Sequence, residues 1–379
     1  MASKTWQSEF NRRDFLRGTA ALGLGGAAAW LAACGGTTGA APSPSPLIYP
    51  KAQIDGDLEY FNWSEYLDPA LITSFEKNYG IKVNQTNFDN MQSMMAKLNA
   101  GIQYDIAFPT MDYTNQLVAA DVLTPIDHTQ LVNWSEIPSY FGNPWYDPKA
   151  NYSVPYAIWT TGICWRTDKV PDALAGSWND IWTLAPKYSG KLFLLDDFQE
   201  TLGMSLLRLH YDVNSGKRPE MDKAVTELLN IKSNVGQFST DDITNLVNGS
   251  AWIHHAWSGD VYQVLSQVNN PEVFKYETAT EGVPTGNDTM VIPKNAKHPG
   301  TAMKFIDWML APEHATQNVN YFGYPQVTKT GLASYTDVVK DYPFLNLTLD
   351  QAITGLRELV PVGARQQLWN QAWTKVKAG

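Results

Sequence analysis

The sequence predicts an α/β protein with a largely parallel sheet, divided into two units of similar size. Short apolar strands alternate with helical segments along most of the chain, which is the order typical of parallel sheets. The length of 379 residues exceeds one ordinary core and suits two domains of about 150 residues each.

Residues 1–33 have the features of an export signal. Segment 11–17 carries paired arginines before Phe-Leu, and the Ala- and Gly-rich run behind it is too short for a comfortable membrane span. The arginine pair indicates the twin-arginine type, although Asn11 stands where that motif usually has Ser or Thr. The Leu-Ala-Ala-Cys string that ends at Cys34 resembles a lipobox, so we expect cleavage before Cys34 and lipidation of its thiol. Residues 34–54 are predicted to form a flexible tether, because Gly, Thr, Ala, Ser and Pro dominate their first part.

The first α/β unit begins with a predicted strand at Leu58–Phe61. Asp68 and Pro69 supply an N-cap and a first-turn proline for a helix that Gly80 ends. Another strand is expected from residue 81, a helix over 94–98, and a third strand over Tyr104–Phe108.

The second unit follows Pro155. Leu192–Leu195 has the composition of a buried strand and precedes an acidic turn and an apolar helix over Thr201–His210. A further strand is predicted at Trp252–Ala256, followed by a helix at Val261–Gln267.

The charge balance excludes some classes of partner. Lys and Arg total 28 against 38 Asp and Glu, a formal net charge of −10, which is the wrong sign for nucleic-acid binding or for a polybasic membrane surface. An acidic protein attracts cationic ligands. Many soluble proteins, however, carry a net negative charge only because it keeps them in solution. With only Cys34 and Cys164, neither a disulfide framework nor a cysteine zinc cluster is expected.

Four predicted loops place acidic or aromatic residues after strands. They span residues 62–66, 109–112, 196–200 and 257–260. Ligands of open parallel sheets bind beyond the carboxyl ends of the strands, so we expect these loops to meet. Their carboxylates, from both units, suit an alkyl ammonium, and their aromatic rings add cation–π attraction. The residues concerned are Trp63, Tyr66, Asp112, Asp197, Glu200, Trp257 and Asp260.

Some of these residues could instead have a purely structural role, in helix capping or in the core. Acidic residues just before helices are usually caps, which is an alternative role for Asp197 and Asp260. Trp63 and Trp257 also fit ordinary core positions.

A series of strings between Asp57 and Gly379 resembles one family, in order along the chain. They are Tyr60–Tyr66, Tyr104–Ile106 with Pro109-Thr110, Tyr152–Tyr156, Thr160–Ile163, Ala256–Val261, Gly323–Pro325 and Ala372–Lys377. Together they resemble the spermidine/putrescine-binding proteins of bacterial ABC importers. The resemblance implies a type II periplasmic-binding fold of two lobes, each a mainly parallel sheet flanked by helices.

The same resemblance implies lobe boundaries. The chain would cross between lobes near Trp159 and Thr285. Lobe 1 would comprise 55–159 plus 286–332, and lobe 2 would comprise 160–285 plus 333–379.

Ligand contacts carried over from the family fall on both lobes. Trp63 and Tyr66 would enclose the aliphatic chain, Ser64 and Thr110 would make polar contacts, and Tyr324 would close the wall from the first lobe.

The remaining contacts would hold the amines. Asp197 and Glu200 would bind one amine end, Trp257 would stack on the chain, and Asp260 and Asp288 would take amine groups.

Departures from the family leave the ligand's length open. Asp112 stands where relatives have Tyr or Ser, Gly286 stands where relatives have an aromatic residue, and Leu359 falls near a glutamine of the spermidine type. Gly286 is expected to leave one face of the aromatic box missing. We expect a polyamine, either putrescine or spermidine, as the ligand.

The resemblance also implies partners. The protein would deliver its ligand to permease subunits driven by a separate ATPase, would meet the membrane through its lipid anchor alone, and would act as a monomer without a cofactor.

Enzyme classes have little support in the sequence. Asp197 and Glu200 lie one helical turn apart, whereas a glycosidase pair flanks its substrate. No nucleophile elbow or Walker loop occurs. His254 and His255 are adjacent, so their side chains diverge in a strand and do not form a metal pair.

Other ligands in the same fold stay open: an amino-sugar, an opine, or a thiamine-like cation. A zwitterion needs a basic partner, and none of the four loops contains Lys or Arg; the placement of Arg166 and Arg365 is not fixed by the sequence. Ferric iron is disfavoured because no Tyr-Tyr pair occurs. A sensor without a transport role is a further alternative.

Overall fold

The computed structural model describes residues 48–345, 357–358 and 363–379. The predicted signal peptide, Cys34 and most of the predicted tether lie outside the described residues, as does Leu359.

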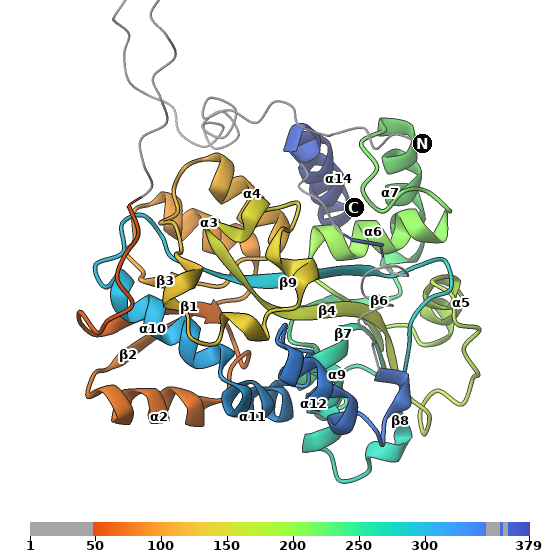
Figure 1. Cartoon of the computed structure of the whole chain (residues 1–379). Helices are drawn as coiled ribbons and strands as arrows, with labels where there is room; N and C mark the ends of the chain where they lie inside the picture. Colours follow the sequence, from red (N-terminus) through yellow and green to blue (C-terminus); the bar gives the residue numbers. More distant parts are fainter. Residues whose placement is uncertain (1–47, 346–356, 359–362) are drawn as a thin grey trace, which may run out of the picture.

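A curled sheet runs through the centre of the molecule (Figure 1). Its strand order is β2-β1-β3-β9-β4-β7-β5-β6, with β10 beside β9 and β8 beside β4. The strands are β1 (Leu58–Trp63), β2 (Val83–Phe88), β3 (Ile106–Ala107), β4 (Ser153–Arg166), β5 (Leu192–Leu194), β6 (Val235–Phe238), β7 (Ile253–Trp257), β8 (Phe274–Glu277), β9 (Pro284–Val291) and β10 (Arg357–Glu358).

The long strand β4 joins two halves of this sheet. Its residues 153–160 pair with β9, whereas residues 161–166 pair with β7 and β8. We call β2, β1, β3, β9 and the start of β4 the first half-sheet, and the end of β4 with β7, β5, β6 and β8 the second. Each half contains three parallel strands: β1, β2 and β3 in the first, and β5, β6 and β7 in the second. Strand β4 runs antiparallel to β9 and to β7, and β9 runs antiparallel to β3.

Helices cover both faces of the sheet (Figure 1). Those around the first half-sheet are α2 (Pro69–Tyr79), α3 (Met91–Asn99), α4 (Met111–Ala119), α10 (Pro299–Leu310) and α11 (Pro312–Phe322). Those around the second are α5 (Asn179–Lys187), α6 (Phe198–Arg208), α7 (Arg218–Lys232), α8 (Asp242–Val247), α9 (Ser258–Gln267) and α14 (Gln366–Ala378). Helix α12 (Lys329–Val338) packs on α11, and the predicted boundary at residue 332 falls inside it.

Alternating residues of β1 serve two layers of core. The ring of Tyr60 packs against Phe305 of α10, whereas the ring of Phe61 stacks on Tyr104, with centroids 4.0 Å apart, in the core that includes Met94 of α3. Because successive side chains of a strand point to opposite faces, one short strand holds both helical layers in place.

Local signals in the sequence fix several helix ends. The Asp68 carboxylate accepts the N–H of Ala70, and Gly80 ends α2 in the left-handed region at φ 66°, as predicted. Helix α6 begins at Phe198, three residues before the predicted start, because the Asp197 side chain caps it. The predicted strand at Tyr104–Phe108 is reduced to the two residues of β3.

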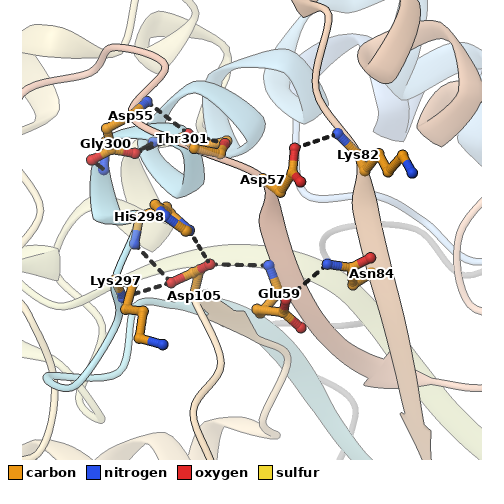
Figure 2. Close-up of polar contacts among 11 residues, drawn as sticks. Asp55, Asp57, Glu59, Lys82, Asn84, Asp105, Lys297, His298, Gly300 and Thr301 are labelled. Carbon is orange, nitrogen blue, oxygen red and sulfur yellow. Dashed lines mark hydrogen bonds and ion pairs between the residues drawn. The ribbon is translucent and has the colours of Figure 1, made fainter.

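Buried Asp105 ties the first half-sheet to the start of α10 (Figure 2). Its carboxylate accepts backbone N–H groups from Glu59 at 3.0 Å and from Lys297 and His298 at 2.8 Å each. The Asp55 carboxylate accepts the next two N–H groups along the chain, at the beginning of α10. These carboxylates satisfy donors that the helix itself leaves unpaired, at the edge of the sheet where β1 begins.

We expect Asp105→Ala to lower the free energy of unfolding by about 3 kcal/mol or more, because it leaves three backbone donors without an acceptor at a buried position. The exposed Asp57 accepts the N–H of Lys82 as its one hydrogen bond from the described residues, so Asp57→Ala should cost less than about 1 kcal/mol. Urea unfolding measures both values. Equal losses in the two variants would contradict this role of Asp105.

Candidate ligand-binding site

A cavity of about 160 Å³ lies where the two half-sheets meet. All eleven predicted binding residues line it: Trp63, Ser64, Tyr66, Thr110, Asp112, Asp197, Glu200, Trp257, Asp260, Asp288 and Tyr324. Most of them follow the carboxyl ends of β1, β3, β5 and β7, which is the position that the parallel-sheet rule indicates.

The cavity has further lining residues that the sequence analysis did not select. They are Phe88, Asp89, Met91, Tyr113, Trp159, Gln199, Thr240 and Asp241. Phe88, Asp89 and Met91 follow β2, and Thr240 and Asp241 follow β6. The strand-end rule applied to those two strands would have found them.

The loop after β1 supplies one aromatic wall. Glu65 adopts the left-handed region at φ 55°, which is costly for a residue with a side chain and turns the chain sharply between Trp63 and Tyr66. The Trp63 ring packs on Phe88 with centroids 4.6 Å apart. The Tyr66 hydroxyl donates to Asp288 Oδ2 at 2.5 Å.

Asp112 on α4 and Asp288 on β9 are the buried carboxylates that the first half of the molecule brings to the cavity, each 3% exposed. Burial raises the pKa of Asp112 to about 6 against the hydrogen bond that Thr110 donates, and nearby Asp197 adds to the rise. Burial also raises the pKa of Asp288 to about 7 against the hydrogen bond from Tyr66, and the negative charge of Asp112 adds to it. Both carboxyl groups are therefore partly protonated near neutral pH.

Helix α6 of the second half-sheet brings Asp197 and Glu200 to the cavity. The Asp197 Oδ1 atom caps the helix by accepting the N–H groups of Gln199 and Glu200. Buried Glu200 accepts the Thr161 hydroxyl at 2.8 Å, and its pKa is raised by burial and then by the charge of Asp197. Asp197 is thus both a cap and a lining residue, so the two interpretations of this residue coexist.

Helix α9 brings Asp260 to the other side of the cavity. Asp260 lies in the first turn and makes no cap; its Oδ1 accepts the Tyr324 hydroxyl at 2.6 Å. The interpretation of Asp260 as a simple cap is therefore wrong. Behind it, fully buried Asp242 accepts the N–H of Trp257 at 3.1 Å, and burial together with the charge of Asp260 raises the Asp242 pKa well above its usual range.

Trp159 occupies the space beside Gly286. A Cβ atom at Gly286 would lie 2.6 Å from the Trp159 ring and 3.1 Å from Met111, closer than side chains pack. Trp159 also lines the cavity. The expected gap in the aromatic wall is therefore wrong, because the indole supplies a face where Gly286 has none.

The lining of the cavity is acidic and aromatic. Among the lining residues, seven are carboxylates and none is Lys or Arg. Arg166 pairs with Asp168 at 3.0 Å, and Arg365 lies over the Trp369 ring; neither is a lining residue. A bound cation would meet only opposite charge here, whereas a carboxylate ligand would meet like charge.

The described part of the chain shows neither a metal cluster nor a membrane-spanning helix. No group of three His, Cys, Asp or Glu residues there is arranged to hold a metal ion, and none of the described helices is both long and apolar enough to cross a bilayer. The adjacent histidines point to different partners: the His254 ring packs on Phe193 and the His255 ring on Trp178.

Comparison with known proteins decides the family. The family of bacterial extracellular solute-binding proteins matches residues 70–346. The spermidine/putrescine-binding periplasmic protein of Escherichia coli (strain K12) is 30% identical over 331 residues, which are 86% of this chain and 93% of the relative. This chain belongs to the bacterial extracellular solute-binding proteins.

Solved structures agree with the fold of this solute-binding protein. A Listeria monocytogenes protein superposes with a TM-score of 0.78 at 30% identity, covering 85% of this chain and 99% of the other. The spermidine/putrescine ABC transporter substrate-binding protein of Streptococcus pneumoniae superposes with a TM-score of 0.64 at 28% identity, covering 85% and 100%. The predicted resemblance and the two-lobed α/β fold are confirmed, and the family is one of solute binding and transport, not an enzyme family.

We expect two carboxyl groups of the ligand-free solute-binding protein to titrate near pH 6 and pH 7, from Asp112 and Asp288, well above ordinary aspartates at about 4. Carboxyl ¹³C chemical shifts followed against pH measure this. The upper transition should vanish in Asp288→Asn and the lower one in Asp112→Asn. Transitions near the ordinary value for both residues would contradict the desolvated site.

Proposed function

We propose that this protein captures a polyamine between its two lobes and delivers it to an ABC importer. The observation that carries the proposal is the lining of the cavity, with its seven carboxylates, its aromatic rings and no lining Lys or Arg. An ammonium group pairs well with carboxylates in a partly dry site, and aromatic faces attract cations and cover methylene groups. The name of the Escherichia coli relative, a spermidine/putrescine-binding periplasmic protein, supports the same ligand class.

The proposed contacts divide the ligand into charged and apolar parts. Trp63, Tyr66 and Trp257 would cover the aliphatic chain, with Tyr324 closing one wall. Ser64 and Thr110 would contribute polar contacts, the second of them through the hydroxyl that already holds Asp112.

The ammonium groups would pair with carboxylates from both half-sheets. Asp197 and Glu200 are proposed to hold one end, and Asp260 the other. Asp112 and Asp288 come from the first half of the molecule, whereas Asp197, Glu200 and Asp260 come from the second. A ligand that contacts carboxylates of both halves stabilises the closed arrangement of the lobes.

The hinge is proposed to lie where β4 and β9 pass between half-sheets. Thr160 pairs with Thr285, and the partners of β4 change at Thr161. This supports the proposed boundaries between residues 159 and 160 and between 285 and 286; the proposed boundary between 332 and 333 lies inside α12. Only two strands have to bend there, so the lobes are free to open and close as bodies.

Export and anchoring complete the proposal. Residues 1–33 would direct the chain across the membrane by the twin-arginine route, and lipidated Cys34 would hold it at the outer face or in the periplasm through the tether 34–54. The folded body would act as a monomer, dock on permease subunits driven by a separate ATPase, and catalyse no reaction.

Titration calorimetry of the purified protein with putrescine, cadaverine, spermidine and spermine tests the proposal. We expect at least one of them to bind with a dissociation constant of about 1 μM or tighter, a free energy near −8 kcal/mol or more favourable. Failure of all four to bind would contradict a polyamine ligand and direct the search to another organic cation.

A further inference from the structure

The carboxylates of the cavity form a row, connected by hydroxyl groups and ring contacts. At one end, Asp260 accepts the Tyr324 hydroxyl at 2.6 Å. The Tyr324 and Tyr66 rings meet edge to face with centroids 5.1 Å apart. The Tyr66 hydroxyl then donates to Asp288 Oδ2 at 2.5 Å. Asp288 and Asp260 are therefore connected through the side chains of Tyr66 and Tyr324.

The row continues from Asp288 to Asp112. Asp288 forms an isolated backbone bridge with Thr110, and the Thr110 hydroxyl donates to Asp112 Oδ1. This places the two buried carboxylates next to each other in the middle of the row. The charge of Asp112 accordingly raises the pKa of Asp288.

The far end of the row is the α6 pair. The charge of Asp197 raises the pKa of Asp112, and the charges of Asp197 and Asp112 raise that of Glu200. The pair on α6 lines the same cavity as Asp112 and Asp288 but comes from the second half of the molecule. The row has three stations: Asp197 with Glu200, Asp112 with Asp288, and Asp260.

The central station, Asp112 with Asp288, has two carboxylate oxygens that can accept further hydrogen bonds. Asp112 Oδ2 is buried without a hydrogen-bond partner among the described residues. Asp288 Oδ1 is buried and has no partner of good geometry there, although the nearby Trp159 side chain lowers the pKa of Asp288. An unpaired buried carboxylate oxygen is costly, so two such atoms beside one cavity indicate a missing donor. A secondary ammonium group carries two N–H donors on one nitrogen and two methylene neighbours.

We propose that Asp112 and Asp288 together seat an internal secondary ammonium, and that Asp112 thereby makes the site selective for a linear triamine over a diamine. This inference rests on the proposed function and goes beyond it, because the same cavity without a central station would serve a diamine. The two terminal ammonium groups occupy the stations at the ends of the row. A diamine of the same length presents a methylene group to the central carboxylate oxygens and leaves them without a hydrogen bond. Sites that hydrogen-bond an N–H group of their ligand discriminate against analogues that lack this N–H group.

The sharpest test compares two ligands of equal chain length, spermidine and 1,8-diaminooctane, which differ in the central N–H₂⁺ and CH₂ groups. Titration calorimetry of the wild-type protein should give at least about tenfold tighter binding of spermidine, the size of a charged hydrogen bond. Asp112→Asn should weaken spermidine binding at least about fivefold more than diamine binding, so that the preference collapses. Asp222→Asn removes the same charge from an exposed position on α7 and should leave both affinities unchanged.

The outcomes separate the inference from the proposed function. Equal binding of the two ligands by the wild-type protein would overturn the central seat while a polyamine function stands. Equal weakening of both ligands by Asp112→Asn would overturn the specificity role of Asp112. Absence of binding by both ligands would overturn the central seat, and the proposed function falls only if putrescine, cadaverine and spermine fail as well. The comparison of ligands on the wild-type protein needs no variant, so it holds even if Asp112→Asn folds poorly.

Discussion

Asp112, Glu200 and Asp288 are buried around one cavity, and their desolvation, reinforced by repulsion from neighbouring carboxylates, is the constraint on which the rest of the site depends. Each is desolvated, and each accepts a hydrogen bond from Thr110, Thr161 or Tyr66. These bonds offset only part of the cost of burial, because the pKa values of all three stay raised. The attraction of a cation between them would offset the desolvation cost and screen the repulsion, which is why this cavity suits a ligand with several ammonium groups.

The buried carboxylates of this cluster come from both halves of the molecule. Asp112 on α4 and Asp288 on β9 come from the first half of the molecule and Glu200 on α6 from the second, and among the described strands β4 and β9 join the two halves. The first half is held at its far edge by Asp105, whose backbone hydrogen bonds join β1 to the beginning of α10. Rigid halves and a narrow connection let the repulsion act on the angle between the lobes, so that a bound cation favours closure.

Local chemistry made much of the site predictable. Strand ends, caps and the family resemblance pointed to the four loops, and Asp197 illustrates how a single residue can satisfy the cap and the site together. The ends of β2 and β6 were missed because these strands are polar and partly exposed, which removes the apolar pattern that marks a strand. Trp159 was missed as a wall because its neighbour β9 lies 126 residues away along the chain, and no local signal reports such a pairing. The hydroxyl partners of Asp288 and Asp260 are likewise products of tertiary packing.

Proton release on ligand binding tests the central claim most directly. Calorimetric titration with spermidine at about pH 6.5, in two buffers of different ionisation enthalpy, gives the number of protons exchanged. Spermidine is fully protonated there, as amines with pKa values near about 10 are, so any released proton comes from the protein. The account predicts a net release, because the carboxyl pKa values raised by burial fall when a cation binds. Binding without proton exchange would show that the carboxylates are already ionised and would contradict desolvated carboxyl groups as the basis of the site.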